Sequence, residues 1–578
     1  MTRNTCTPPW IPMLTAAAAA MIVGCGTQSG PAAQSPAAGG AANASGPVTP
    51  KVAKVALAIS PPSVEANNLT EGAHLAYWQL SPMYEFLVGV EAEGKEIVPQ
   101  LATEWKLEPD GKSWRFLLRK GVQFQKGFGE FQASDVKYTY DMLMRAEPPS
   151  VQGQQSYMSL LSDVEVAGEY EVVLRSKTPD AGLLGAISQA ENIFPLASRK
   201  DGEGRNKGNK LPTLVEEPFA GTGPYAYAGR EQGVSLRYQR ASEKHWRQTP
   251  DFPELEFRFV KENSTKLAAL LAREVHLATV PPDLAKSAEA QGFKSVEGKA
   301  PGLHIMGGFY GVWLNKRIGA QEQLNADPNA TYVFPNSPLM DVRVRRALNK
   351  AIDREAINKA FLRGKGTPIY NEYFHPDRPG WNPEWEKRFK DAYGYDPDAA
   401  RKLLAEAGYS PANPFSTTIE IQPNALFSAA PDVSEAIGNY WQAIGIKVSM
   451  DTSDVAIQRA KRQRLEDMEN RNSVIVTSIR QLLGVGVYND IARGTRAGVQ
   501  LPELKEVYDQ ILVTLDPKKS DELWRKWGDM AFERQVNMPM FWIPAEILVD
   551  PSVVRDYVFP GSISGTYTHF EYIKATPK

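Results

Sequence analysis

Residues 83–143 read MYEFLVGVEAEGKEIVPQLATEWKLEPDGKSWRFLLRKGVQFQKGFGEFQASDVKYTYDML, and the order of elements in this stretch decides the fold. Pro109-Asp110-Gly111 is a turn signal that separates two short alternating runs. Trp114, Phe116 and Leu118 follow at a spacing of two residues, which points their side chains to one face of a strand. The pattern therefore predicts a β-hairpin.

A second strand and a helix are predicted directly after the hairpin. Residues 121–124 form a short apolar run that ends at a Lys126-Gly127 turn, which favours a strand. Ser134 is a candidate N-cap for a helix with Val136, Tyr140 and Leu143 on one side. The stretch thus predicts a compact subdomain of strands and one helix.

The same stretch resembles the extracytoplasmic solute-binding proteins of family 5, the receptors of peptide, nickel-chelate and some oligosaccharide ABC importers. Five later segments continue the resemblance in the family's order. They are GTGPY (221–225), PELEFRFVKENSTKLAALLAREVHLATVPPD (253–283), MDVRVRRALNKAIDREAI (340–357), YDPDAARKLLAEAGY (395–409) and the hydrophobic run MPMFWIPAEILV (538–549). No single segment is decisive, whereas the ordered set is specific and spans most of the chain.

The resemblance implies an α/β, two-lobed periplasmic-binding-protein fold of type II, with a third subdomain inserted in lobe I. We expect the chain to cross between the lobes near 303–314 and 538–547. The expected domains are a signal peptide (1–24), a lipidated flexible linker (25–50), lobe I (51–78, 215–303 and 548–578), its inserted subdomain (79–214) and lobe II (304–547 with hinge strands at its ends). The stretch 318–337 is longer than its family counterpart, and nothing in it indicates a role.

Local signals agree with an α/β chain. Asp396 is a predicted N-cap with Pro397 at the first helical position and Gly408 as the terminator. Residues 445–450 follow an apolar helix and predict the next strand.

The N-terminus has the pattern of an export signal. Arg3 is the only charged residue among the first 50, and residues 13–23 form an apolar run of 11, too short to span a bilayer. Ile22-Val23-Gly24-Cys25 resembles a lipobox, which implies cleavage before Cys25 and lipidation of its thiol. The alternative is an incidental cysteine near an ordinary cleavage site.

Composition limits the function classes. Residues 26–50 carry no charged or aromatic side chain, so this segment predicts a flexible linker with a reach of roughly 25 to 30 Å. Lys+Arg (65) and Asp+Glu (67) balance, which argues against nucleic acid as a partner. We expect a monomer tethered by lipid at the cell membrane, facing the periplasm or the cell exterior.

Catalytic and metal-binding motifs are missing from the sequence. The six histidines lie far apart, and the chain has no H-E-x-x-H, G-x-S-x-G or phosphate-loop motif. We therefore predict no enzyme activity, no metal and no cofactor. An exported lipoprotein hydrolase is the alternative from another class.

A binding cleft needs apolar walls and a few fixed polar groups. The resemblance places such residues on the two crossing strands and in the second lobe. The candidates are Tyr84, Tyr310, Trp313, Arg480, Tyr488 and Trp542. The aromatic side chains would supply flat apolar surface and Arg480 would hold a ligand carboxylate; core packing and a solvent-facing ion pair are the respective alternatives.

These features predict a substrate-binding lipoprotein that captures a solute between two closing lobes and delivers it to ABC permease subunits. A peptide is the favoured solute. Residues 473–495 (SVIVTSIRQLLGVGVYNDIARGT) lack the Trp and Asp-Pro pattern of many peptide binders, so an oligosaccharide or a metal chelate stays open as the ligand.

Overall fold

The computed structural model describes residues 48–61, 77–93, 97–145, 161–177, 179, 183–189, 194–205, 217–310, 312, 334, 336–372, 374–376, 378–422, 427, 429–454, 457–458, 461, 468–478, 499–560 and 568–578. The predicted signal peptide, Cys25 and most of the linker lie outside this set, as do 318–333 and 335. Among the described helices, none combines the length and apolar character needed to cross a membrane.

One mixed sheet runs through most of the described chain. Its strand order is β15-β14-β16-β12-β17-β11-β1-β10-β9-β8, and β13 pairs with β17 outside this path. The bounds are β1 (Lys54–Ile59), β8 (Tyr225–Glu231), β9 (Ser235–Arg240), β10 (Glu254–Phe259), β11 (Leu277–Ala278), β12 (Lys294–Phe309), β13 (Thr367–Pro368), β14 (Ser416–Glu420), β15 (Lys447–Asp451), β16 (Arg471–Ser478) and β17 (Asn537–Val549).

A separate antiparallel sheet has the order β4-β5-β7-β6, and two strand pairs, β2–β3 and β18–β19, stand apart. These strands are β2 (Val88–Val90), β3 (Ile97–Pro99), β4 (Ala102–Leu107), β5 (Ser113–Leu118), β6 (Leu161–Gly168), β7 (Glu171–Ser176), β18 (Val554–Tyr557) and β19 (Ile573–Ala575). The pairing of β4 with β5 confirms the predicted hairpin.

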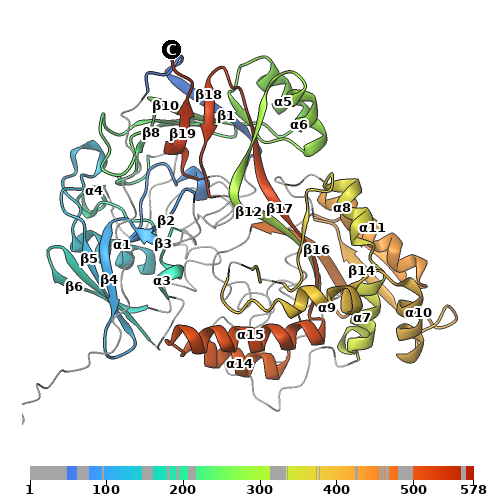
Figure 1. Cartoon of the computed structure of the whole chain (residues 1–578). Helices are drawn as coiled ribbons and strands as arrows, with labels where there is room; N and C mark the ends of the chain where they lie inside the picture. Colours follow the sequence, from blue (N-terminus) through green and yellow to red (C-terminus); the bar gives the residue numbers. More distant parts are fainter. Residues whose placement is uncertain are drawn as a thin grey trace, which may run out of the picture. The chain divides into compact units, whose positions relative to one another are not determined.

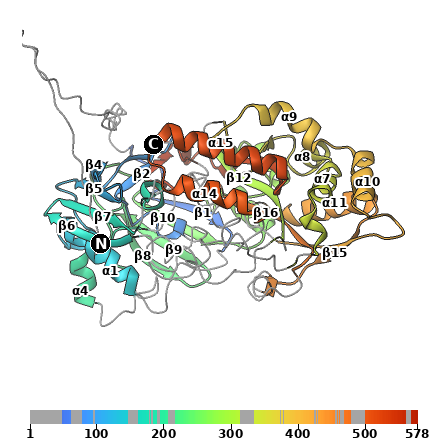
Figure 2. The ribbon, with the colours of Figure 1, turned by 90° about the horizontal axis from the view of Figure 1, so that it is seen from below.

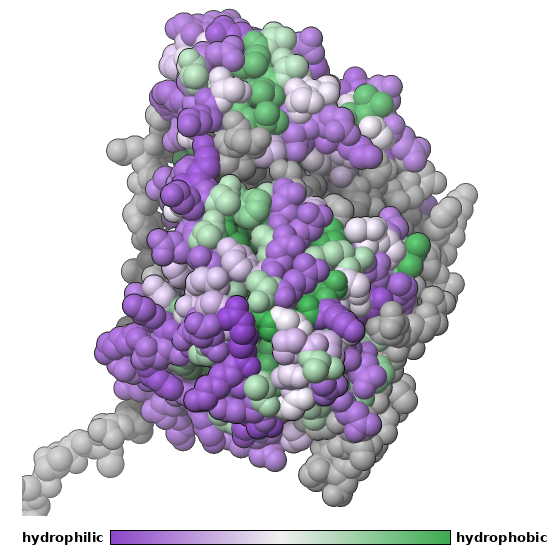
Figure 3. All heavy atoms as spheres, turned by 90° about the vertical axis from the view of Figure 1, so that its right-hand side faces the viewer, coloured by the Kyte–Doolittle hydropathy of each residue, from purple (hydrophilic) through white to green (hydrophobic). Residues whose placement is uncertain are grey.

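Helices cover the sheets. They are α1 (Ala133–Arg145), α3 (Leu183–Ala186), α4 (Arg199–Arg205), α5 (Asn263–Leu271), α6 (Pro282–Glu289), α7 (Val342–Lys350), α8 (Arg354–Phe361), α9 (Glu384–Tyr393), α10 (Pro397–Glu406), α11 (Ala430–Ala443), α14 (Pro502–Leu512) and α15 (Pro517–Arg534). Helices α7 to α11 gather at the opposite end from the four-stranded sheet (Figures 1 and 2). On the face of the molecule shown in Figure 3, hydrophilic side chains predominate and apolar side chains form small groups among them.

Two local predictions need correction. Ser134 lies inside α1 rather than at its N-cap, because the helix begins at Ala133 and the Asp135 carboxylate accepts the Gln132 N–H at 2.9 Å. Residues 121–124 form only an isolated bridge, Gln123 with Glu130, because a 3-10 turn follows at once. The helix after Asp396 is confirmed, since its carboxylate accepts the Ala399 N–H at 2.9 Å.

The buried residues form two large hydrophobic cores. The first core contains the odd-numbered residues of β1, which alternate with Ala56 and Ala58 on the opposite face. It also includes Ala545 and Ile547 of β17. The second core contains Ile305 of β12 and Ile543 of β17, together with residues of α7 to α15. The boundary between the two cores therefore falls within β12 and β17.

Both predicted crossing runs are strands, and they pair antiparallel with each other (Figure 1). β12 begins nine residues before the expected 303. The two strands are thus the part of the sheet that both cores share.

A buried ion-pair network ties distant segments of the first core together. The Arg247 guanidinium donates to Glu85 at 2.8 Å and to Glu571 at 2.5 Å, and both carboxylates are buried. Trp246 Nε1 and the Thr222 hydroxyl also donate to Glu85. Burial raises the pKa of the Glu571 carboxyl, but the charge of Arg247, its hydrogen bond to Glu571 and smaller contributions from other neighbours together outweigh burial, and the pKa lies below its usual value.

We predict that Arg247→Met lowers the free energy of unfolding by about 3 to 5 kcal/mol, because two buried carboxylates lose their cation. Urea denaturation measures the effect. Arg401→Met is the control: its partner Asp398 is exposed, and its loss should change stability by less than about 1 kcal/mol. Equal effects of the two variants would refute the structural role of Arg247.

Lys266 is a buried lysine whose ammonium donates to two neutral side chains. Its Nζ donates to Ser60 Oγ at 2.6 Å and to Asn263 Oδ1 at 3.0 Å. Burial lowers the pKa of Lys266 to about 8. The folded state therefore releases this proton more readily than the unfolded state does.

We predict that Lys266 makes the protein more stable as the pH rises from about 8 to about 10.5, because only the unfolded state stays protonated there. The difference in unfolding free energy between parent and Lys266→Met should grow by up to about 3 kcal/mol over this window. Lys286→Met, at an exposed lysine on α6, is the matched control for the loss of an ammonium group. A flat difference for Lys266→Met would contradict the prediction.

Candidate functional site

The crossing strands bring chemically reactive side chains together where the cores meet. His304 on β12 lies opposite Trp542 on β17, and Trp542 pairs on its other side with Thr367 of β13. The residues that follow β13, Glu372 and His375, return to the same place. Three segments far apart in the sequence thus meet around one indole ring.

Trp542 is the centre of this group. The ring of His304 lies edge-on at 5.4 Å between ring centroids, and the ring of His375 lies edge-on at 5.8 Å. Ile369, which is fully buried, packs against the indole. Trp542 is itself only 3% exposed, so its ring is held in place by its neighbours.

A histidine and a carboxylate lie side by side within the same group. His304 Nε2 is 3.7 Å from Glu372 Oε1 and 3.3 Å from the Met306 sulfur. His304 and Glu372 are both buried. We call His304, Met306, Glu372, His375 and Trp542 the crossing-strand cluster. It combines an apolar ring with ionisable groups in a low-dielectric place, where each polar contact counts more than in water.

The geometry does not favour a metal ion. Across the described residues, no group of three or more His, Cys, Asp or Glu side chains is arranged to hold one. The cluster can instead offer ring surface, hydrogen bonds and a carboxylate charge, which are the means by which proteins bind polar organic ligands.

Tyr310 extends the site beyond the end of β12. Its backbone N–H donates to the Arg471 carbonyl at 2.8 Å, and its side chain is fully buried. The Arg471 guanidinium donates to Asp451 at 2.6 Å and lies 3.7 Å from Glu420. Tyr310 is therefore fixed beside a buried charged group of the second core.

Asp451 is the anionic centre of that group. Lys461 donates to it at 3.2 Å and the Ser453 hydroxyl at 2.5 Å. Burial raises the pKa of Asp451, but the hydrogen bonds from Ser453 and Arg471 outweigh burial and hold the pKa well below its usual value. The carboxylate stays ionised and keeps the ends of β15 and β16 together.

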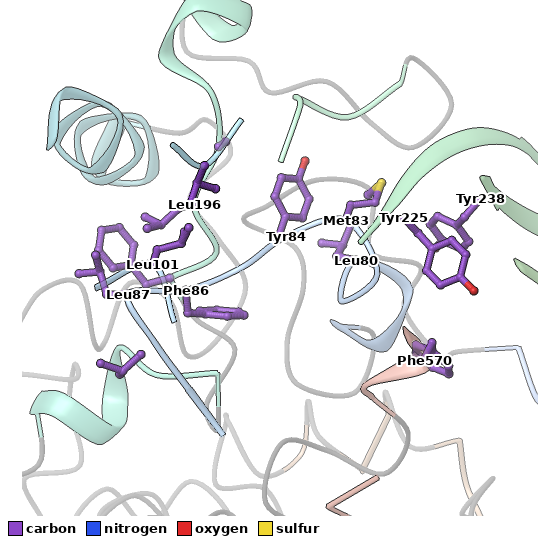
Figure 4. Close-up of a cluster of buried hydrophobic side chains, with 14 of the residues drawn as sticks. Leu80, Met83, Tyr84, Phe86, Leu87, Leu101, Leu196, Tyr225, Tyr238 and Phe570 are labelled. Carbon is purple, nitrogen blue, oxygen red and sulfur yellow. The ribbon is translucent and has the colours of Figure 1, made fainter. Parts of the chain in front are cut away.

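Tyr84 lies elsewhere. Its ring belongs to the first core, among Met83, Phe86 and Tyr225 (Figure 4). Its hydroxyl donates to the Phe219 carbonyl at 2.6 Å, and burial raises the pKa of the phenol. The structure thus places the Tyr84 side chain in the first core. Trp313, Arg480 and Tyr488 lie outside the described residues.

Sequence reasoning missed His304, Glu372 and His375. The six histidines are distant in the sequence and form no metal-binding motif, yet His304 and His375 contact the same indole. One signal existed: His304 and Trp542 both lie on predicted crossing strands, and pairing those strands places them close together. Glu372 and His375 carried no signal, because their position depends on the β13 pairing.

The chain matches the family model of bacterial extracellular solute-binding proteins, family 5 Middle, over residues 96–477. It is 28% identical over 398 residues to heme-binding protein A of Haemophilus influenzae, covering 66% of this chain and 66% of that protein. It is 26% identical over 400 residues to the dipeptide-binding protein of Escherichia coli, covering 66% and 68% respectively. The matched region is thus about two thirds of each relative.

Solved structures share the fold. A dipeptide binding protein from Pseudoalteromonas sp. SM9913, in complex with Met-Leu, superposes with a TM-score of 0.70 at 18% identity, covering 91% of this chain and all of that one. NikA from Brucella suis, in complex with Fe(III)-EDTA, gives a TM-score of 0.70 at 21% identity with the same coverage. The expected two-lobed periplasmic-binding-protein fold is confirmed.

The family model covers well over half of the chain, in the order of segments found in the sequence. Its members are extracytoplasmic proteins that bind solutes for ABC transporters. This chain belongs to the bacterial extracellular solute-binding proteins of family 5.

Proposed function

We propose that this protein is the substrate-binding lipoprotein of an ABC importer, which captures a short peptide between two lobes and delivers it to the permease. The observation that carries the proposal is that two separate cores share the strands β12 and β17, so that a ligand held at their junction can contact both lobes. Ligand binding would stabilise the closed arrangement by its differential affinity.

We assign lobe I to residues 51–78, 215–303 and 548–578, with 79–214 as its inserted subdomain, and lobe II to 304–547. The core assignments support the start of lobe II near Ile305, which lies in the second core with Ile543. Ala545 and Ile547 lie in the first core, so the hinge strand at the end of lobe II passes from one core to the other between 543 and 545. The division places the crossing-strand cluster just inside lobe II.

We assign ligand contact to Trp542, with Tyr310, Trp313, Arg480 and Tyr488 as further candidates. The fixed indole and the neighbouring ionisable groups support Trp542 in this role. An aromatic ring offers large contact area at a small cost in side-chain entropy. The protein acts by binding and closure, without catalysis, and works as a monomer.

A peptide ligand is favoured by the relatives. The curated dipeptide-binding protein of Escherichia coli and several di/tripeptide-binding proteins of Pseudomonas aeruginosa match this chain. One neighbour of the same fold holds Met-Leu. The carboxylate of Glu372 is buried, and a carboxylate forms strong charge-assisted hydrogen bonds with an ammonium group. This favours a ligand that carries an ammonium group, as a peptide does.

A porphyrin ligand is the second candidate. The first relative named above is a heme-binding protein, at 28% identity. The crossing-strand cluster contains two imidazoles and a thioether, and these groups are known axial ligands of haem iron. Absorption spectroscopy distinguishes the two candidates, because bound haem has a Soret band and a bound peptide has none.

We predict that dipeptides such as Met-Leu raise the melting temperature, since saturation at roughly 100 times Kd adds about 2.7 kcal/mol of stability. The measurement is a thermal-shift series with dipeptides, tripeptides, glutathione, oligosaccharides, metal chelates and haem. If haem binds and its Soret band shifts, the porphyrin becomes the proposed ligand in place of the peptide. Turnover of a ligand, followed by mass spectrometry, would point to the hydrolase alternative, and no shift with any class would reject the receptor function.

We predict that Trp542→Leu weakens the ligand found in that series by about tenfold or more, because aromatic contact area is lost. Isothermal titration calorimetry gives the affinity. Trp381→Leu is the matched control: Trp381 is a partly buried tryptophan of the second core, distant in sequence from the crossing strands, and its loss should leave affinity within about twofold of the parent. Equal losses would exclude Trp542 from the site.

The lipid anchor is tested by Cys25→Ser, which we predict moves the protein from the membrane fraction to the soluble fraction, because two acyl chains are needed for stable anchoring. Cys6→Ser is the control, since Cys6 lies in the segment that would be removed. Retention of Cys25→Ser at the membrane would refute the anchor.

A further inference from the structure

β12 and β17 form a two-stranded neck between the cores. Along the edge of β17 away from β12, β13 pairs only at Phe541–Trp542 and β11 only at Leu548–Val549. On β12, pairing with β16 begins at Leu303. Within the described residues, 296–302 of β12 and 544–547 of β17 therefore have no strand partner other than each other.

The ladder of hydrogen bonds is interrupted inside this neck. Pro301 lies opposite Pro544, and neither residue has a backbone N–H to donate. The register shifts on both sides of this pair, between Glu297 and Pro301 and between Pro301 and Leu303. A strand pair with missing donors and an irregular register bends more easily than a regular one. The neck is the place where the two cores can move relative to each other.

Two acidic residues face each other on the first-core side of the proline pair. Glu297 on β12 lies directly opposite Glu546 on β17. Glu546 stands between Ala545 and Ile547, both residues of the first core, and its side chain is 16% exposed. Like charges at directly opposite positions repel, so this strand pair needs a cation nearby.

The cation comes from the second-core side. Lys365 follows Leu362 of the second core and precedes β13. Its ammonium contacts Glu297 Oε1 at 3.2 Å and also contacts Glu546. Arg363 lies 3.8 Å from Glu546. Burial and the charge of Glu297 raise the pKa of the Glu546 carboxyl, whereas Lys365 lowers it by its charge and its hydrogen bond; the net change is upward. The ion pairs therefore reach across the proline pair from one core to the other.

We propose that Lys365, Glu297 and Glu546 form a hinge latch that sets how readily the two lobes move about the Pro301–Pro544 pair. Lys365 is a positioning residue: it acts on the arrangement of the lobes and not on the ligand. A motion at the proline pair changes the distance from Lys365 to the two carboxylates, whereas the ion pairs hold the arrangement seen here. The consequence for ligand affinity rests on the proposed function; the latch itself does not.

The latch should be salt-sensitive and moderate in strength. Lys365 is 38% exposed and Glu297 54%, so water and salt screen their interaction. Glu546 is less exposed and its pairing is screened less. We expect loss of the latch to change the ratio of lobe arrangements by about two- to fivefold.

Single-molecule fluorescence transfer on the ligand-free protein tests the latch. The Cys6→Ser, Cys25→Ser protein receives dyes at Lys286→Cys on α6 and Lys402→Cys on α10. Both positions are exposed; α6 packs on the Ala56–Ala58 face of β1, and α10 packs on the second core. We predict that Lys365→Met shifts the distribution of lobe separations and removes its dependence on salt. An unchanged distribution overturns the latch.

A double-mutant cycle identifies the partners. Glu297→Gln with Glu546→Gln should give the same distribution as Lys365→Met, and adding Lys365→Met to that pair should change nothing further. Lys387→Met is the matched control, because Lys387 pairs with Glu384 within the single helix α9 at 2.5 Å. A control that shifts the distribution as much as Lys365→Met would also overturn the latch.

The affinity measurement separates the two proposals. If the protein binds peptides, the dipeptide affinity of Lys365→Met should change by the factor by which the ligand-competent population changes. A shifted distribution with no ligand of any class leaves the latch standing and rejects the proposed function. An altered affinity with an unchanged distribution rejects the latch and leaves the proposed function standing.

Discussion

The antiparallel pairing of β12 with β17 is the constraint on which the rest of this structure depends. Backbone hydrogen bonds fix the register of two strands that belong to both hydrophobic cores, and this register decides which side chains meet. A slip by one residue would move His304 away from Trp542 and Glu297 away from Glu546 at the same time. The fold, the crossing-strand cluster and the neck are consequences of one pairing.

Buried arginines fix the segments that make the family recognisable. In residues 340–357, Arg345 donates to the carbonyls of Leu339 and Arg534, and Arg354 donates to those of Pro539 and Tyr393. Burial lowers the pKa of Arg354 to about 10. These side chains satisfy carbonyl groups at helix ends and loops, which would be costly to bury alone. The two arginines of the motif therefore have a structural role in the fold.

Sequence reasoning succeeded where the signal was local. The hairpin at Pro109-Asp110-Gly111 and the cap at Asp396 depend on a few neighbouring residues, and both are confirmed. It failed at Ser134 because Asp135, one residue on, satisfies the Gln132 N–H instead. It could not find Glu372 or His375, because their position depends on β13 pairing with β17. From the sequence, Tyr84 could belong either to a binding site or to a core, and the core around it exists only once segments 135 residues apart have packed.

The crossing-strand cluster and the neck lie next to each other on the same strand, β17. Trp542 and Glu546 lie on one strand four residues apart, about 13 Å along β17, with Pro544 between them. On the proposed function, a ligand that displaces the indole would push on the strand that carries Glu546, and a change at the neck would alter the support of the indole. Packed interiors transmit such small shifts because they have little free volume. On the proposed function and with the proposed latch, contact with a ligand and the arrangement of the lobes would thus be coupled through a few residues of β17.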